Sequence, residues 1–233
     1  MALAGALLVA SSAAMAGVVV KSSGPSAGDY PVGKKIDDEA TITLKAGDSV
    51  TVLTSKGTRV MSGAGTYKVG DRPKATRARF AALTRKRAAN RVRTGAVRGA
   101  APATSGEQPM NPNLWYVDVS RSGPMCLYDL SAVRLWRPFS EGIATYRVVD
   151  TNTQSAIDIT FDDGEAIAAL DPARMTIAQG TPYTIAGPEG TDVSSVTFVP
   201  LSEDYPEADQ LAEALVAQGC LAQVDLLAER LGG

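Results

Sequence analysis

The chain has 233 residues, of which 45% are hydrophobic and 21% are charged. This length and composition are typical of a folded protein with one large or two small domains. The sequence contains no histidine, which excludes Ser-His-Asp and Cys-His nucleophile systems, histidine general bases and histidine-ligated zinc. The formal net charge of −2 is unevenly distributed: residues 68–98 carry 11 basic residues and one acid, whereas residues 99–233 carry 6 basic and 19 acidic residues.

The first sixteen residues have the pattern of a cleaved signal peptide. An apolar run from Leu3 to Ala10 is followed by small residues, and Ala14-Met15-Ala16 matches the small-x-small rule for signal peptidase. The apolar run is shorter than the roughly 20 residues that are needed to span a bilayer. The sequence therefore predicts export to the periplasm with cleavage after Ala16, and the alternative is a buried N-terminal helix.

The chain has two cysteines, Cys126 and Cys220. In an exported protein an even number of cysteines favours a disulfide. A bridge that encloses about 95 residues is expected to stabilise the fold by roughly 4–5 kcal/mol through the entropy of the unfolded chain. The alternative is a pair of buried free thiols, since cysteine is also a small hydrophobic residue.

Residues 17–71 are predicted to form a small antiparallel β-sheet or barrel. Short stretches rich in β-branched residues are separated by turn residues, and Lys56-Gly57 between two such stretches predicts a hairpin. Leu44, Val50, Val52 and Val60 are expected to share the buried face of this sheet. The strands are predicted at 17–21, 40–44, 49–53 and 58–61.

Within this region Gly47-Asp48 precedes one predicted strand, Gly57 precedes the next, and Gly63-Ala64-Gly65 forms a glycine-rich turn. This pattern resembles the FecR-type periplasmic domain. The layout of the whole chain is similar to that of exported proteins of Alphaproteobacteria that carry this domain. In those proteins a second β domain contains a Trp-Arg-Pro strand end, here Trp136-Arg137-Pro138, and the C-terminal helices flank a Gly-Cys pair, here Gly219-Cys220. The resemblance implies a periplasmic, non-enzymatic module.

Residues 72–113 are predicted to be a basic helix over 73–93 followed by a flexible linker over 94–113, because the first part favours helix and the second lacks periodicity. The basic helix is expected to remain solvated or to dock on the acidic C-terminal domain. The alternative is that it binds an external anionic partner, which is an acidic protein face, a lipid or a glycan. Nucleic acid is not expected, since export argues against it. The candidate residues for binding an anionic partner are Arg77, Arg79, Arg85, Lys86, Arg87, Arg91 and Arg93.

Residues 114–233 are predicted to form an acidic β-sandwich that ends in two helices, so the predicted fold class is mainly β. Apolar stripes from Ala208 to Val216 and from Leu221 to Leu231 predict two amphipathic helices that dock on the sandwich. Ser202 or Asp204 is expected to cap the first helix, and Gly219 to end it. The strands are predicted at 114–119, 133–136, 144–149, 157–161, 182–185 and 193–199.

Two further clusters allow a structural or a functional interpretation. Asp162-Asp163-Gly164-Glu165 places three carboxylates near a turn, a combination that suits calcium, but Asp-Gly is also typical of a hairpin turn. Trp115, Tyr116 and Trp136 lie on predicted strands and are expected to pack in the core, although such side chains also line sugar sites.

The sequence contains no constellation that points to catalysis, to a cofactor or to a metal. We therefore expect a non-catalytic, periplasmic binding or sensor-accessory module that acts through contacts with another envelope protein. The alternatives are an envelope-structural or glycan-binding protein and, less favoured, a hydrolase that uses two carboxylates.

Overall fold

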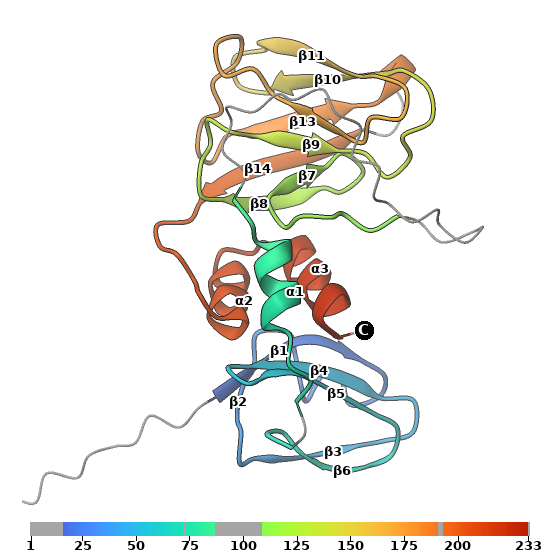
Figure 1. The fold of residues 1–233 in the computed structure, drawn as a ribbon, viewed down its shortest axis with the longest axis vertical. Helices are drawn as coiled ribbons and strands as arrows, with labels where there is room; N and C mark the ends of the chain where they lie inside the picture. The colour runs from blue at the N-terminus through green and yellow to red at the C-terminus, as the bar shows by residue number, and fades with distance from the viewer. Residues whose placement is uncertain (1–15, 72, 87–108, 191–192, 233) are drawn as a thin grey trace, which may run out of the picture.

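The computed structural model describes residues 16–71, 73–86, 109–190 and 193–232. The fold is mainly β, with several sheets, and two of the helices follow one another at the C-terminus (Figure 1). The predicted signal peptide lies outside the described residues except for Ala16, which begins the first strand. The predicted cleavage after Ala16 stays a prediction.

Six strands build the N-terminal part of the molecule. Four of them form an antiparallel sheet in the order β2-β1-β4-β5, and the other two form the antiparallel pair β3-β6. Buried apolar side chains between these two sheets form one core cluster, to which Val19, Val50 and Val52 belong. The strands are β1 (Ala16–Ser23), β2 (Lys35–Asp37), β3 (Thr41–Leu44), β4 (Ser49–Thr54), β5 (Gly57–Ser62) and β6 (Gly65–Lys68).

The predicted hairpin is present between β4 and β5, with Ser55 and Lys56 in the turn and Thr54 paired with Gly57. This register corrects one prediction. Val60 pairs with Thr51 and is 42% exposed, whereas Met61 pairs with Val50 and occupies the core position that was expected for Val60. Since neighbouring residues of a strand point to opposite faces, the turn geometry decided which of the two was buried.

Eight strands form two sheets in the C-terminal part. The sheet β11-β10-β13-β14-β8 is antiparallel except for the parallel pair β14-β8, and the sheet β12-β9-β7 contains the parallel pair β7-β9. Side chains of both sheets share one core, which contains Leu135 from the smaller sheet and Phe161 and Phe198 from the larger one. The strands are β7 (Tyr116–Asp118), β8 (Gly123–Leu127), β9 (Arg134–Trp136), β10 (Ala144–Asp150), β11 (Ala156–Phe161), β12 (Ile167–Ala169), β13 (Pro182–Ala186) and β14 (Ser194–Pro200). A single 3-10 turn, η1 (Pro188–Gly190), precedes β14.

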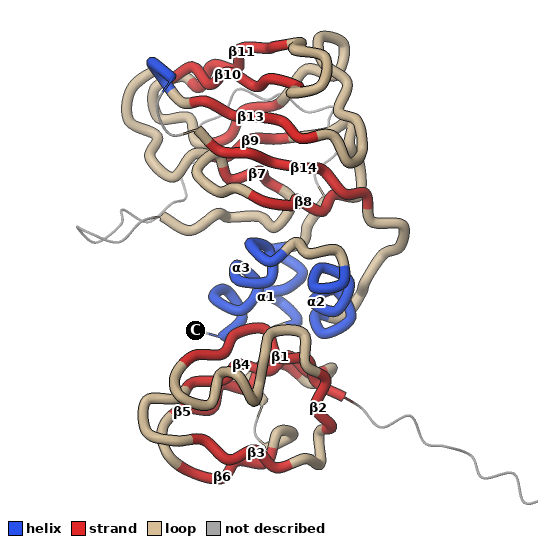
Figure 2. The backbone as a smooth tube through the Cα atoms, turned by 180° about the vertical axis from the view of Figure 1, so that it is seen from behind, coloured by secondary structure: helices blue, strands red, loops and turns tan. Residues whose placement is uncertain are grey.

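Three helices lie between the two groups of sheets (Figure 2). They are α1 (Arg77–Leu83), α2 (Ala208–Ala217) and α3 (Leu221–Gly232). Their apolar faces form one core cluster with Val18, Val20 and Leu53 of the N-terminal sheet. The expectation that the C-terminal helices dock on the C-terminal sheets is therefore incomplete, because the same helices also cover β1 and β4. This double coverage explains why consecutive residues Val18, Val19 and Val20 are all fully buried.

Residues 87–93 of the helix predicted over 73–93 lie outside the described part, and among the described residues the helix is α1 alone. It begins at Arg77 and ends at Leu83, while Lys74 forms a β-bridge with Thr58. A Cβ atom on Gly57 would lie 2.1 Å from the Lys74 carbonyl oxygen, so this close approach requires glycine. Phe80 and Leu83 are buried against α2 and α3, which gives α1 a firmer contact with the core than its sparse apolar stripe suggests.

The described end of the linker predicted over 94–113 is packed against the fold. Residues 94–108 lie outside the described part, but Asn111 and Asn113 are buried. Asn111 donates to the Tyr116 carbonyl at 2.8 Å, and Asn113 donates to the Arg85 carbonyl at 3.1 Å. Side-chain amides thus fix residues that composition alone assigned to a linker.

The ends of the C-terminal helices confirm one prediction and correct another. Gly219 has φ +74 directly after α2, as expected for a glycine that ends a helix. The N-cap of α2 is Glu207, which makes no side-chain capping hydrogen bond, so neither Ser202 nor Asp204 caps this helix.

The predicted disulfide is present between Cys126 and Cys220, whose Cα atoms are 5.9 Å apart. Cys126 belongs to β8, at the edge of the five-stranded sheet, and Cys220 directly precedes α3. The bridge therefore fastens α3 to the C-terminal sheets.

Candidate functional site

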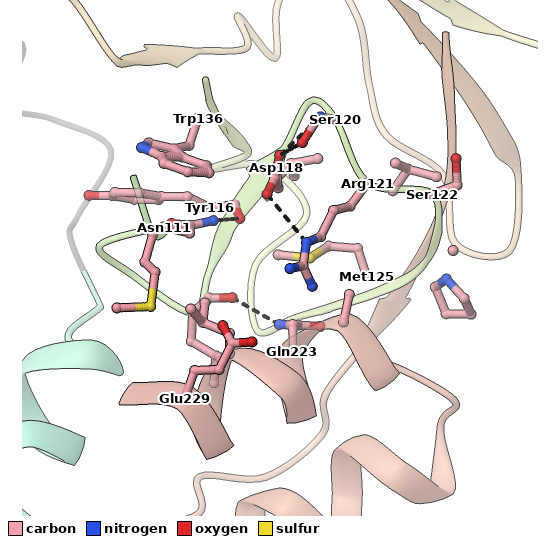
Figure 3. Close-up of a pocket in the computed structure, with 18 of the residues that line it drawn as sticks. Asn111, Tyr116, Asp118, Ser120, Arg121, Ser122, Met125, Trp136, Gln223 and Glu229 are labelled. Atoms are coloured by element: carbon pink, nitrogen blue, oxygen red, sulfur yellow. Dashed lines mark hydrogen bonds and ion pairs between the residues drawn. The ribbon is translucent and has the colours of Figure 1, made fainter. Parts of the chain in front are cut away.

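A cavity of about 230 Å³ lies where α3 meets β7, β8 and the loop that joins these two strands (Figure 3). Residues from four separate parts of the sequence contribute to its walls. The lining includes Met110 and Asn111 before β7, Tyr116 and Asp118 of β7, Ser120, Arg121 and Ser122 of the connecting loop, Met125 of β8, Trp136 of β9, Val196 of β14, and Gln223, Leu226 and Glu229 of α3.

The floor of the cavity is held by the buried side chain of Gln223. Its Oε1 atom accepts a hydrogen bond from the Cys126 backbone N–H at 2.7 Å, and its Nε2 atom donates to the carbonyl oxygens of Leu114 and Cys126, both at 2.9 Å. Together with the disulfide at Cys220, this amide ties the first turn of α3 to β8. The cavity is therefore preformed rather than assembled by a loop movement.

One wall carries a carboxylate and a guanidinium. Asp118 Oδ1 accepts hydrogen bonds from the backbone N–H of Ser120 at 2.9 Å and from its hydroxyl at 2.6 Å, which fixes the tight turn after β7. Asp118 Oδ2 lies 3.7 Å from Arg121 Nε. Figure 3 shows the Arg121 guanidinium reaching from this wall toward the space above Gln223. Arg121 donates no side-chain hydrogen bond to any residue in the described part of the chain.

The opposite wall is formed by α3 and by the segment before β7. Glu229 of α3 forms an ion pair with Lys21 of β1, with 3.6 Å between Nζ and Oε1. Arg230 donates to the carbonyl oxygens of Met110 and Asn111, which fastens that segment to the helix. The carboxylate of Glu229, on the α3 wall, is therefore paired with a cation that lies outside the cavity.

The aromatic residues singled out in the sequence are largely buried, and two of them also line the cavity. Tyr116 and Trp136 are buried, and they lie next to each other in the cavity wall (Figure 3). Trp115 packs edge-on against Tyr128, with 4.7 Å between ring centroids, and its indole donates to the Thr84 carbonyl at 2.7 Å. Trp115 therefore joins the end of α1 to the C-terminal part, and it does not line the cavity as Tyr116 and Trp136 do.

The basic candidates are not gathered at the cavity. Arg77 forms an ion pair with Glu207 at 3.0 Å, and Lys86 pairs with Asp204 and lies 3.8 Å from the centroid of the Tyr128 ring. Arg79 and Arg85 are exposed on the same segment. Arg87, Arg91 and Arg93 lie outside the described residues. Arg77 and Lys86 therefore contact the acidic segment before α2 within the same chain.

The acidic run at 162–165 forms a turn that is organised by Arg137. This buried guanidinium donates to the carbonyl oxygens of Ser140, Gly142, Asp162 and Glu165 at 2.8–3.0 Å. Asp163 accepts from the Gly142 N–H, and Glu165 accepts from the Asp162 N–H. Across the residues that the structure describes, no group of three or more Asp, Glu, Cys or His side chains is arranged to hold a metal ion.

The Arg137-centred loop presents two exposed apolar side chains. Phe139 is 63% exposed and Ile143 is 72% exposed, and both belong to the segment whose carbonyl groups Arg137 holds. Arg137 therefore holds the backbone of the loop that carries both apolar side chains.

A carboxyl group with a raised pKa, Asp209, lies away from the cavity. Burial raises the pKa of Asp209, in the first turn of α2, and its Oδ1 atom is buried without a hydrogen-bond partner. Asp209 does not line the cavity, so it offers no proton donor there.

Comparisons of the chain with protein-family models, curated proteins and solved structures find no match. The FecR-type resemblance therefore stays a prediction. Among the described residues, no helix is long and apolar enough to cross a membrane.

Sequence reasoning did not find Asp118, Arg121 or Gln223. The pattern Asp118-x-Ser120 is a readable signal for a turn, but nothing local indicates that this turn faces the first turn of α3, about a hundred residues later in the chain.

Proposed function

We propose that the protein is a non-catalytic, exported module of the periplasm, and that it acts by binding. In this proposal an N-terminal FecR-like β domain and a C-terminal β-sandwich are joined through the helix layer. The partner is another envelope protein. The observation that carries the proposal is the preformed cavity between α3 and the β7–β8 loop, whose walls are fixed by Gln223 and by the Cys126–Cys220 bridge.

The state of the charged groups in the cavity supports binding rather than hydrolysis. Asp118 accepts two hydrogen bonds from Ser120 and lies beside Arg121, and Glu229 is paired with Lys21. A carboxylate pair that acts as acid and base needs one member with a raised pKa. Asp209, a carboxyl group whose pKa is raised by burial, lies on α2 and not in the cavity.

The disulfide supports export, since such bonds persist in oxidising compartments. Phe139 and Ile143, which are 63% and 72% exposed, would offer apolar side chains to a partner protein.

Photo-crosslinking from the rim of the cavity tests the proposal. Met110 lines the cavity and is exposed, so benzoylphenylalanine at this position should capture the partner in intact cells. Ala222 also lines the cavity, and we expect the added variant Ala222→Phe to fill it and abolish the crosslink. Ala217→Phe, on an exposed position of α2, is the matched control. A crosslink that survives Ala222→Phe, or no crosslink at all, would contradict the proposal.

A second candidate function is glycan binding, favoured by Tyr116 and Trp136 in the cavity wall. It predicts that the protein co-sediments with purified peptidoglycan or binds lipopolysaccharide, and that Ala222→Phe abolishes this binding. Co-sedimentation that is unchanged by the variant would place the glycan contact elsewhere.

A further inference from the structure

Arg121 lines the cavity and has hydrogen-bond donors that no acceptor among the described residues satisfies. Its contact with Asp118 is a single one, at 3.7 Å from Nε, and the terminal guanidinium nitrogens have no acceptor among the described residues. The side chain is 47% exposed, and it points into the cavity (Figure 3). An incoming anion therefore finds a guanidinium that is positioned but not saturated.

The other charges of the cavity do not compete for the same ligand group. Glu229 forms an ion pair with Lys21 of β1, and Asp118 is held by Ser120. Asp118 nevertheless keeps a negative charge beside Arg121, which disfavours a dianion such as a phosphate monoester more than a monoanion. A guanidinium can donate two parallel hydrogen bonds to a carboxylate, which matches the two terminal nitrogens that are free here.

The size and the remaining lining limit the rest of the ligand. A volume of about 230 Å³ is below the roughly 300–1,000 Å³ of pockets for drug-sized ligands. Beside Arg121 the walls present Met110, Met125 and Leu226. This space suits one small apolar group attached to the anionic end, rather than a long or highly polar molecule.

We propose that the cavity binds the carboxylate end of a ligand that carries a small apolar group, with Arg121 receiving the carboxylate. This inference rests on the proposed binding function and names its ligand chemistry. Two sources share that chemistry: a free short-chain carboxylic acid, and the C-terminus of a partner protein that ends in an apolar residue.

Calorimetric titration of the purified mature protein with matched probes tests the inference. The probes are hexanoate, hexanamide and hexylamine, together with acetyl-Ala-Ala-Leu as the free acid and as the C-terminal amide. We expect each acid to bind at least tenfold more tightly than its amide, because the amide cannot accept the charge-assisted pair of hydrogen bonds that the guanidinium offers a carboxylate. Preference for the peptide acid identifies a protein C-terminus as the source, and preference for hexanoate identifies a free acid.

Variants of the same wall make the test specific. Arg121→Gln should make acid and amide bind equally, and Asp118→Asn should tighten acid binding, because it removes the adjacent negative charge and keeps a side-chain acceptor for Ser120. Arg147→Gln, which breaks an exposed ion pair between Arg147 of β10 and Asp158 of β11, is the matched control and should change nothing.

Three results overturn the inference: equal binding of acid and amide to the unmodified protein, a preference that persists in Arg121→Gln, or no binding of any probe. If hexanamide or hexylamine binds as tightly as hexanoate and Ala222→Phe abolishes that binding, the proposed binding function stands while the carboxylate preference falls. If no probe binds, the crosslink from Met110 still decides the proposed function.

Discussion

The side-chain amide of Gln223 takes the place of a neighbouring strand at the free edge of β8. It satisfies both the N–H and the carbonyl oxygen of Cys126, and it also reaches the Leu114 carbonyl. All three backbone groups belong to buried residues, and the loss of the amide deprives each of them of this hydrogen bond. The integrity of the cavity floor should therefore depend on this one side chain.

Gln223→Leu keeps a side chain of similar size and removes all three hydrogen bonds. Leaving a buried polar group without a partner costs about 1–3 kcal/mol. For one N–H and two carbonyl groups, less the gain from burying leucine, we expect the free energy of unfolding to fall by about 4 kcal/mol. Gln223→Glu should also destabilise at neutral pH and recover partly in acid, where a protonated carboxyl can donate again.

Urea denaturation of the oxidised protein, followed by circular dichroism, measures the effect. With a slope of roughly 2 kcal/mol per molar urea, the midpoint should fall by about 2 M without a change in slope. Gln210→Leu, at an exposed position of α2, controls for the substitution itself. A loss for Gln223→Leu that equals the loss for Gln210→Leu would refute the reasoning.

Alkylation of the denatured protein should label two thiols only after reduction, and reduction should lower the free energy of unfolding by roughly 4–5 kcal/mol, since the bridge joins residues 94 apart; labelling without reductant would contradict this. Because burial raises the pKa of Asp209, its stabilising contribution is present at low pH and lost as pH rises through the folded-state pKa. Asp209→Asn should therefore raise stability at pH 7, with a difference from the unmodified protein that vanishes below about pH 4; equal curves at both pH values would contradict it. Arg137→Met should cost at least about 2 kcal/mol and expose the segment around Phe139 to protease, and an unchanged cleavage rate would show that the loop does not depend on Arg137. Replacement of Arg85, Lys86, Arg87 and Arg91 by Gln should weaken any binding to anionic vesicles and its dependence on salt; unchanged binding would assign this segment an internal role.

Local sequence patterns predicted the strands and helices whose secondary structure depends little on the segments they pack against. The valine-rich and threonine-rich stretches became β1, β4 and β14, and the apolar stripes after Ala208 and Leu221 became α2 and α3. The short strands β2, β6, β8 and β12 were missed, since three to five residues carry too little periodicity to distinguish a strand from a turn.

The errors share a physical cause, which is that the deciding contact is distant in sequence. The hairpin register places Met61 in the core instead of Val60. Helix α1 ends at Leu83, although the composition that favours a helix continues beyond it. Asn111 and Asn113 look like linker residues until their amides meet the backbone of Tyr116 and Arg85.

The amino-acid sequence by itself determined a mainly β chain with a C-terminal helix pair and a bond between Cys126 and Cys220, because strand and helix periodicity and the pairing of two thiols are properties of short segments and residue counts. Only the tertiary structure decided that the helices lie between two groups of sheets, and that Arg121 and Gln223 meet around one cavity. Their convergence depends on packing between segments about a hundred residues apart, which no local pattern encodes.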